Sequence, residues 1–222
     1  FYFIVNPDVT IADLPAGTHD GINYINDSSV VLALTAPDKD FVYAIGDFSN
    51  WEAESEYFMN RTTDGKQWWI TVNGLTPQVE YVYQYLVDGS LRIADPYCDK
   101  ILDSYNDFYI SEATYPGLID YPTGKTSGIV SVLQTAQSPY NWQVTNFVKP
   151  NTDNMIVYEL LLRDFIAARN FDVLKDTLAY LKTLGVNVIE LMPFNEFEGN
   201  DSWGYNPSFY FAPDKYYGTK DM

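Results

Sequence analysis

The stretch that decides the fold of the first half of the chain is Glu80-Tyr81-Val82-Tyr83-Gln84-Tyr85-Leu86-Val87-Asp88-Gly89. Every second residue from Tyr81 to Val87 falls on one face of an extended backbone and the alternate residues fall on the other, which is the period of a β-strand. Asp88-Gly89 is a pair typical of a two-residue hairpin turn. We therefore expect a return strand to begin at Leu91-Arg92-Ile93.

Three earlier segments also have the composition of short strands. They are rich in β-branched and aromatic residues, and each ends at Pro, Gly or Asn within a few residues: 30–34, 41–45 and 68–72. Short strands separated by turns indicate an all-β sandwich. We place it at residues 21–112, after an N-terminal extension at residues 1–20.

The pattern weakens at residues 113–150, where prolines, glycines and small polar residues gather. The aromatic side chains of Tyr115, Tyr121, Tyr140 and Trp142 need cover from water, so we expect a docked connection and not a floppy linker.

After residue 150 the pattern changes to strand, helix, strand. The apolar run at residues 155–161 is typical of a strand buried on both faces of a parallel sheet. Apolar residues then recur at steps of three and four over residues 171–181, which predicts an amphipathic helix with Asn170 as N-cap and Gly185 as stop. A second buried strand is predicted at residues 186–192, parallel to the first and joined to it by a right-handed crossover.

Composition excludes several classes of protein. The 222 residues are 46% hydrophobic and 17% aromatic, which is too rich for intrinsic disorder. With 30 acidic and 13 basic residues the formal charge is −17, the wrong sign for a phosphate backbone, so no nucleic-acid partner is expected. No apolar run approaches the roughly 20 residues of a membrane-spanning helix.

The soft metal ligands are too few for a zinc site of the usual His/Cys kind, and we expect no metal in this chain. Cys98 is the single cysteine and His19 the single histidine. A catalytic nucleophile of the Cys–His or Ser–His–Asp kind would have to use His19 as its base. The turn-like sequence around His19 favours an exposed loop histidine instead.

The loop at residues 194–207 follows the second predicted strand and is dense in aromatics, amides and carboxylates. Chemistry in β/α folds collects on loops at the carboxyl ends of strands, and this mixture suits a sugar, which offers apolar faces and a rim of hydroxyls. The alternative is a structural loop whose Trp and Tyr side chains pack on the sheet.

Several carboxylates are candidates for the pair, roughly 5 Å apart, that a retaining glycosidase needs. Glu196, Glu198 and Asp201 could be offered, although solvated loop acids are the favoured interpretation in so acidic a chain. Glu159 and Glu190 interrupt apolar strands, which favours inward-facing structural groups satisfied by their neighbours, with a functional role as the alternative.

In the first domain Trp51 follows a strand on the turn Gly46-Asp47-Phe48-Ser49-Asn50-Trp51. It could stack on a glycan or cap the core of the sandwich, and both interpretations stay open.

Residues 41–97 resemble the immunoglobulin-like, starch-binding-type module of carbohydrate-binding module family 48. The resemblance is carried by Val42-Tyr43-Ala44-Ile45-Gly46-Asp47-Phe48-Ser49-Asn50-Trp51, by Tyr81-Val82-Tyr83-Gln84-Tyr85-Leu86-Val87-Asp88-Gly89 and by Asp95-Pro96. Glycan-binding members of that group carry an aromatic just after the Asp-Gly pair, whereas Ser90 and Leu91 follow here. The resemblance therefore implies a docking role for this module.

From Val157 onward the chain is similar to the α-amylase family, glycoside hydrolase family 13, in its isoamylase and branching-enzyme-like branch. Val157-Tyr158-Glu159-Leu160-Leu161-Leu162-Arg163-Asp164-Phe165 resembles the first barrel strand, and Leu184-Gly185-Val186-Asn187-Val188-Ile189-Glu190-Leu191-Met192-Pro193 the second. The following loop is matched by Ser202-Trp203-Gly204-Tyr205-Asn206-Pro207, with Phe211-Ala212-Pro213 and Tyr216-Tyr217-Gly218-Thr219. The resemblance implies that Tyr205 stacks on the sugar at the subsite of cleavage, with Asn206 and Trp203 beside it.

In that family the nucleophilic Asp, the acid/base Glu and a transition-state-stabilising Asp follow the fourth, fifth and seventh strands. We therefore expect them beyond Met222, and we assign no residue of this chain a catalytic role. The expected architecture is multi-domain: an immunoglobulin-like β-sandwich, a connector at residues 113–150, and at residues 151–222 the start of a TIM (β/α)8 barrel truncated after about two strands.

The resemblance implies the N-terminal portion of a glycoside hydrolase that acts on starch- or glycogen-type α-glucans by a retaining mechanism. This chain alone is expected to be inactive. The alternative is a non-catalytic α-glucan-binding or scaffold protein. The expected partner is an α-glucan polysaccharide or oligosaccharide, no cofactor is expected in this chain, and calcium is left open for the full-length protein. An extracytoplasmic location (secreted, periplasmic or cell-surface) is favoured over a cytoplasmic one, and the oligomeric state is open.

Overall fold

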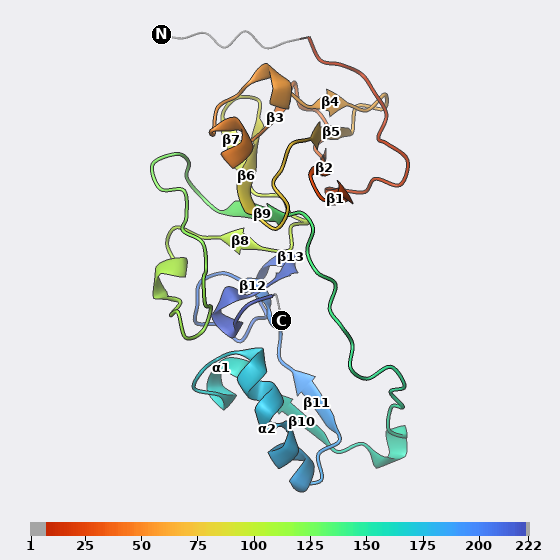
Figure 1. Cartoon of the computed structure of the whole chain (residues 1–222), viewed down its shortest axis with the longest axis vertical. Coiled ribbons are helices and arrows are strands. Elements are labelled where there is room, and N and C mark those ends of the chain that lie inside the picture. The colour runs from red at the N-terminus through yellow and green to blue at the C-terminus, as the bar shows by residue number, and fades with distance from the viewer. Residues whose placement is uncertain (1–7, 221–222) are drawn as a thin grey trace. The chain divides into compact units, whose positions relative to one another are not determined.

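The computed structural model describes residues 8–220, which form two compact units (Figure 1). The first takes the described residues up to Ser104 together with Asp120–Gln137, and the second takes Tyr105–Ile119 and the described residues from Ser138 onward. Residues 1–7 of the predicted N-terminal extension lie outside the described residues, as do residues 221–222.

Two antiparallel sheets build the first unit. One has the order β1-β2-β5-β4, and the other has the order β3-β6-β9-β8 with β7 also paired to β6. The orders β1-β2-β5-β4 and β3-β6-β9 are those of an immunoglobulin constant-type sandwich whose last strand is β9. Strand β8 is added to the second sheet beyond β9. The strands are β1 Gly21–Asn26, β2 Ser29–Thr35, β3 Val42–Gly46, β4 Asn60–Arg61, β5 Gln67–Val72, β6 Glu80–Val87, β7 Leu91–Ile93, β8 Ile101–Leu102 and β9 Val130–Gln134.

Side chains from both sheets meet in one buried cluster. Leu32 of β2 and Trp68 of β5 lie in it with Tyr83 and Tyr85 of β6, and all four are fully buried. The two tyrosines lie on one of the two faces of β6 that the alternation defined. Because aromatic side chains remove large apolar areas from water, this cluster is the main source of stability of the sandwich.

The opposite face of β6 is buried as well. The Gln84 side chain is fully buried, and its amide nitrogen donates to the carbonyl oxygens of Ser127 (3.0 Å) and Ile129 (2.7 Å). The segment just before β9 therefore covers this face, and it satisfies a polar group that would be costly to bury alone.

Strand β9 comes from the segment that the sequence analysis assigned to the connection. It pairs with β6 along Glu80–Tyr83 and with β8 along Ile101–Leu102. The proline and glycine content of the surrounding residues hid this short strand, whose partners are far away in the sequence. The sandwich thus extends beyond the predicted limit at residue 112.

The predicted hairpin after β6 is confirmed. Asp88 and Gly89 have φ of 49° and 70°, the left-handed pair that a type I′ turn requires, and β7 pairs back along β6. The Asp88 carboxylate also accepts from the backbone nitrogens of Asp40 (2.9 Å) and Phe41 (3.2 Å), which ties the turn to the start of β3.

A buried carboxylate joins the strands of the second sheet. Asp95 is fully buried and its Oδ2 accepts from the hydroxyls of Tyr83 (2.8 Å) and Tyr85 (2.9 Å), while its Oδ1 accepts from the backbone nitrogen of Tyr97 (2.9 Å). Burial raises the pKa of the Asp95 carboxyl, and the three donors oppose that shift.

The second unit contains the predicted strand–helix–strand element. Strands β10 and β11 pair in parallel, and helix α2 packs on them through Leu174 and Leu181, which share a buried cluster with Leu160 of β10. Asn170 caps α2 by accepting from the Val173 nitrogen (2.9 Å), and Gly185, at φ 87°, follows its end. The elements are β10 Val157–Leu160, α1 Leu162–Phe165, α2 Phe171–Thr183, β11 Val188–Leu191, β12 Asn195–Phe197 and β13 Pro207–Pro213.

The predictions that the first of these strands is buried on both faces and that the second is buried are wrong for this chain. Val157, Tyr158 and Glu159 are exposed, and only Leu160 of β10 is buried. No residue of β11 is buried either. The sheet of β10 and β11 has two strands in the described part of the chain, so one helix covers only part of it.

Short 3-10 helices complete the described residues, at η1 Asp47–Ser49, η2 Ser55–Tyr57, η3 Asp107–Tyr109, η4 Thr152–Asn154 and η5 Lys215–Tyr217. Within residues 8–220 no helix combines the length and apolar character needed to cross a lipid bilayer.

We expect Asp95→Ala to lower the free energy of unfolding by about 3 kcal/mol or more, because two phenol hydroxyls and one amide lose their buried acceptor. Asp95→Asn keeps the acceptor oxygens in part and should cost less. Urea unfolding followed by tryptophan fluorescence measures both, with the exposed Glu52→Ala as a control expected within about 0.5 kcal/mol of the parent. Equal stability of Asp95→Ala and the control would contradict a structural role for this carboxylate.

Candidate functional site

The predicted loop at residues 194–207 is in part a β-hairpin. Strands β12 and β13 pair antiparallel, with Glu196 opposite Phe209 and Phe197 opposite Pro207. The Asn195 side chain donates to the carbonyl oxygen of Tyr210 (2.7 Å). The register is irregular at both steps of β12, which explains why the sequence shows no clean alternation there. The candidate residues therefore lie on the short connection at residues 198–206.

Trp203 and Tyr205 present exposed rings on this connection. Their side chains are 64% and 66% exposed, whereas Gly204 between them is buried. Gly204 has φ of 85°, and a Cβ built on it would lie 2.2 Å from the carbonyl oxygen of Pro193. Only glycine allows the backbone to pass so close to Pro193, and the neighbouring rings are left facing solvent.

Hydrogen bonds hold the rest of the connection in place. The Gly204 nitrogen donates to the Ser202 hydroxyl (3.0 Å), and that hydroxyl donates to Asn206 Oδ1. The exposed Asn206 side chain is thus oriented by its own loop, next to Tyr205 in sequence. The structure brings the three residues implied by the resemblance onto one ordered turn.

Arg163 anchors this turn to the first strand of the parallel sheet. It lies on α1, directly after β10, and its Nη1 donates to the Ser202 carbonyl oxygen (3.0 Å) and to Asp201 Oδ1 (2.8 Å). The Arg163 side chain is only 12% exposed, whereas Asp201 is 96% exposed, so the ion pair is a surface one and the contact with the Ser202 carbonyl oxygen is the main anchor. The sequence analysis gave Arg163 no role, because nothing in its spacing shows which loop it reaches.

The three acidic residues of the segment do not form a pair of catalytic type. Glu198 and Asp201 are exposed, as expected for solvated loop acids. Glu196 is buried, which corrects that interpretation for this residue: its carboxylate forms an ion pair with Lys215, and Lys215 also pairs with Asp107 (3.3 Å). A buried ammonium needs such partners, so the sequence could not place Glu196 without knowing what Lys215 faces.

Three carboxyl groups lie around Lys215: those of Glu196, Asp107 and Asp214. Burial alone would lower the pKa of Lys215, but the carboxylates of Glu196 and Asp107 outweigh it and raise that pKa. Burial raises the pKa of Glu196, and burial with the nearby Glu196 charge raises the pKa of Asp214 to about 7. Lys215 forms ion pairs with Glu196 and Asp107 but not with Asp214, and the neighbouring Glu196 charge favours the protonated form of Asp214. The cluster ties β12, η3 and η5 together.

Glu159 and Glu190 are not inward-facing groups as the sequence suggested. Both are exposed, and they are direct neighbours in the parallel register of β10 and β11. Because both carboxylates are exposed, water solvates their like charges, and neither carboxylate needs a hydrogen-bond or ion-pair partner inside the protein.

Trp51 is buried, with 5% of its surface exposed, and its Nε1 donates to Asp47 Oδ1 (3.1 Å). Asp47 Oδ2 in turn accepts from the Val82 nitrogen of β6 (2.9 Å). This position favours the capping role that the sequence left open over contact with a glycan.

The remaining candidates for chemistry are not assembled. His19 is exposed, with its Nδ1 beside the carbonyl oxygen of Asp20 (2.9 Å), as a loop histidine would be. Cys98 is buried and burial raises the pKa of its thiol, which keeps it protonated. Among the described side chains, no group of three or more His, Cys, Asp or Glu is placed to hold a metal ion.

The chain is similar to known proteins in sequence and in fold, although no protein-family model matches it. It is 26% identical over 219 residues to the 1,4-alpha-glucan branching enzyme GlgB of Oceanobacillus iheyensis, covering 91% of this chain and 30% of that protein. The solved structure of a putative alpha amylase from Salmonella typhimurium matches with a TM-score of 0.67 and 25% identity, over 91% of this chain and 29% of that one. GBS pullulanase SAP in complex with maltotetraose shares the fold, with a TM-score of 0.62, 20% identity, and coverage of 89% and 29%.

The resemblance to the α-amylase family, on its branching-enzyme-like side, is therefore confirmed. The chain spans less than a third of the length of each of these relatives.

We expect the stability contributed by Asp214 to fall as pH rises. Its pKa is about 7 in the folded protein and near the ordinary 3.8 when unfolded, so the folded state keeps a proton between those values that the unfolded chain has released. The parent should therefore lose up to about 4 kcal/mol of its free energy of unfolding between pH 4 and 8, and Asp214→Asn should not show this loss. Asn keeps a side-chain oxygen that can accept from the Tyr216 nitrogen, so the variant should retain that hydrogen bond.

Urea unfolding at pH 4, 6 and 8 tests this expectation through the difference between the parent and variant profiles. The exposed Asp176→Asn, on α2 of the same unit, serves as the control and should keep the parent's profile. Parallel profiles for Asp214→Asn and the parent would show that Asp214 ionises normally.

We also expect Gly204→Ala to disturb the turn more than Gly199→Ala. Both glycines have positive φ (85° and 77°), so both changes carry the backbone penalty of about 1 kcal/mol, but a Cβ at Gly199 meets nothing within 4 Å. The overlap with Pro193 should add about 2 kcal/mol at Gly204 and speed amide hydrogen exchange at Trp203 and Tyr205. If the two variants behave alike, the close approach to Pro193 does not position the rings.

Proposed function

We propose that this chain is the amino-terminal part of an α-amylase-family enzyme that acts on α-glucans, and that the turn carrying Trp203, Tyr205 and Asn206 contacts the sugar. The observation that carries the proposal is the pair of exposed rings on a turn held by Gly204 and Arg163 next to the carboxyl end of β10. Its family relatives support the choice of α-glucan as substrate.

The chemistry of this turn suits a pyranose. The exposed faces of Trp203 and Tyr205 offer flat apolar area for the C–H faces of a sugar, and Asn206 and the rim carboxylate Glu198 offer partners for its hydroxyls. Because hydrogen bonds within the turn already orient it, little ordering entropy is lost when a glucan binds.

We propose that β10 and β11 are the first two strands of a (β/α)8 barrel. Apolar residues on β10 that are exposed here, Val157 and Tyr158, would be covered by further strands of that barrel. Substrate-binding turns would then gather at the carboxyl ends of the strands, where the turn after β12 lies next to Arg163.

The retaining mechanism requires a nucleophilic carboxylate and an acid/base carboxyl about 5 Å apart. Glu196 forms an ion pair with Lys215, and Glu198 and Asp201 are exposed, so we assign none of them to that pair. In this proposal the catalytic carboxylates belong to other parts of the enzyme, and this stretch contributes a substrate contact.

For the first unit we propose the role of a starch-binding-type module of carbohydrate-binding module family 48. Its strand order is the immunoglobulin type, and its Gly46-Asp47-Phe48-Ser49-Asn50-Trp51 turn buries the tryptophan. A buried Trp51 suits a module that docks on its neighbours through other surfaces and does not stack glycan on this ring.

The proposed action on α-glucans can be tested with the protein expressed from the complete reading frame. We expect Tyr205→Ala to lower kcat/KM on soluble starch about tenfold or more, because the stacking surface at the reacting sugar is lost. Tyr180→Ala, on the outer side of α2 and similarly exposed at 61%, should leave turnover unchanged. The 222-residue chain alone should release no reducing sugar.

Reducing-end release reports hydrolysis, and the iodine spectrum of the glucan reports transfer. Unchanged turnover in Tyr205→Ala would refute the assignment of the turn. A complete protein that binds α-glucan without turning it over would support the alternative of a binding or scaffold protein.

A further inference from the structure

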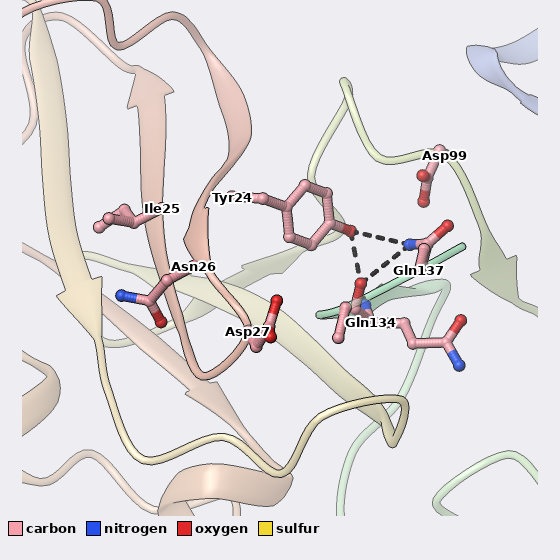
Figure 2. Close-up of a pocket in the computed structure, with 8 residues that line it drawn as sticks. Tyr24, Ile25, Asn26, Asp27, Asp99, Gln134 and Gln137 are labelled. Atoms are coloured by element: carbon pink, nitrogen blue, oxygen red, sulfur yellow. Dashed lines mark hydrogen bonds between the residues drawn. The ribbon is translucent and has the colours of Figure 1, made fainter. Parts of the chain in front are cut away.

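The first unit contains an open cavity of about 330 Å³ that neither the resemblance nor the candidate turn accounts for. It lies where the end of β1 and the turn after it approach the end of β9, and Figure 2 shows Tyr24 between Asp27 and Gln137 there. Its volume is within the range of small-molecule sites. Trp51 and the Asp88-Gly89 hairpin do not line it.

The Tyr24 ring is held in a defined position and stays accessible. Its side chain is 44% exposed, while its hydroxyl accepts from the Gln134 backbone nitrogen and from Gln137 Nε2, both at 3.4 Å. Gln137 Nε2 also donates to the Gln134 carbonyl oxygen (2.9 Å). These contacts join β1 of one sheet to β9 of the other, so the Tyr24 hydroxyl bridges the two sheets while part of its ring stays exposed.

The local backbone is irregular on both sides of the ring. The pairing of β1 with β2 shifts register between Tyr24 and Asn26, and bulges of this kind re-aim side chains at edges and beside sites. Ala136, which lines the cavity, has φ of 56°, a left-handed conformation that is strained for a residue with a Cβ. Such strain persists only where the surroundings impose it, and it is frequent at binding sites.

The polar groups around the ring select against anions. Asp27 and Asp99 bring two carboxylates to the cavity, the Gln137 and Gln134 side chains bring amides, and no Lys or Arg is among its lining residues in the described part of the chain. Carboxylates and amides accept hydrogen bonds from hydroxyl groups, whereas a phosphate would be repelled. An aromatic face with such a rim is complementary to a neutral sugar.

We infer that this cavity is a second carbohydrate-binding site, in which one neutral pyranose unit stacks on Tyr24 and its hydroxyls donate to Asp27, Asp99 and Gln137. The cavity belongs to the first unit, whereas the substrate turn at Tyr205 belongs to the second. That the sugar belongs to an α-glucan rests on the proposed function; that it is a neutral sugar rests on the cavity alone.

The test uses the ¹⁵N-labelled 222-residue chain titrated with maltoheptaose, cellohexaose or glucose 6-phosphate to about 10 mM, a range that detects weak binding. We expect maltoheptaose to shift the Gln134 backbone amide and the Gln137 side-chain amide, and glucose 6-phosphate to shift neither. Tyr24→Ala should weaken binding about tenfold or more through loss of the stacking face. Tyr97→Ala, equally exposed at 46% but not lining the cavity, should bind as the parent does.

Asp27→Ala provides a second variant that leaves the Tyr24 contacts between the sheets in place, and it should also weaken binding. Shifts that localise elsewhere, or that are unchanged in both Tyr24→Ala and Asp27→Ala, would overturn the cavity as a site while leaving the proposed function intact. Binding of cellohexaose in place of maltoheptaose at this cavity would support the carbohydrate site and count against α-glucan as the ligand. Absence of shifts with both oligosaccharides would overturn the inference.

Discussion

A charged group that leaves water must find opposite charge or hydrogen bonds, and the second unit is organised around one such group, the ammonium of Lys215. Its pairing with Glu196 and Asp107 brings together a hairpin strand and two short helices that are far apart in sequence. Removing one partner would leave a buried charge uncompensated, which is far more costly than losing a surface ion pair.

The same constraint acts in the first unit with the sign reversed. Asp95 is a carboxylate in the interior of a sandwich, and the hydroxyls of Tyr83 and Tyr85 supply the donors that water would have supplied. The aromatic residues of β6 thus have two functions, since their rings fill the core and their polar ends satisfy a buried charge. Fully paired polar groups of this kind favour one arrangement of the sheets over alternatives.

The two proposed sugar contacts show a common physical design. Tyr205 and Tyr24 both expose ring faces, and in both places the supporting backbone is unusual: Gly204 packs against Pro193, and Ala136 adopts a left-handed conformation. An aromatic side chain loses little conformational freedom when its surroundings already hold it, so more of the stacking energy remains for binding. Rigid presentation is therefore the feature that links the separate sites.

Local patterns determined much of this protein. The alternation in β6, the left-handed pair Asp88-Gly89, the N-cap Asn170 and the helix stop at Gly185 depend on contacts within a few residues, and each forms as the sequence predicts. The rings at Trp203 and Tyr205 could also be singled out, because aromatics between polar loop residues are visible in the sequence.

Only the tertiary structure decided the features that depend on distant partners. Strand β9 forms because β6 and β8 offer it a ladder, and Glu196 is buried because Lys215 needs its charge. Trp51 is buried on a turn that is tied to β6, because Asp47, which accepts from the Trp51 indole nitrogen, also accepts from the Val82 backbone nitrogen. The cavity at Tyr24 exists because two sheets bring β1 and the end of β9 together. Burial and charge pairing are properties of what surrounds a residue, whereas periodicity and turn chemistry are properties of the chain itself.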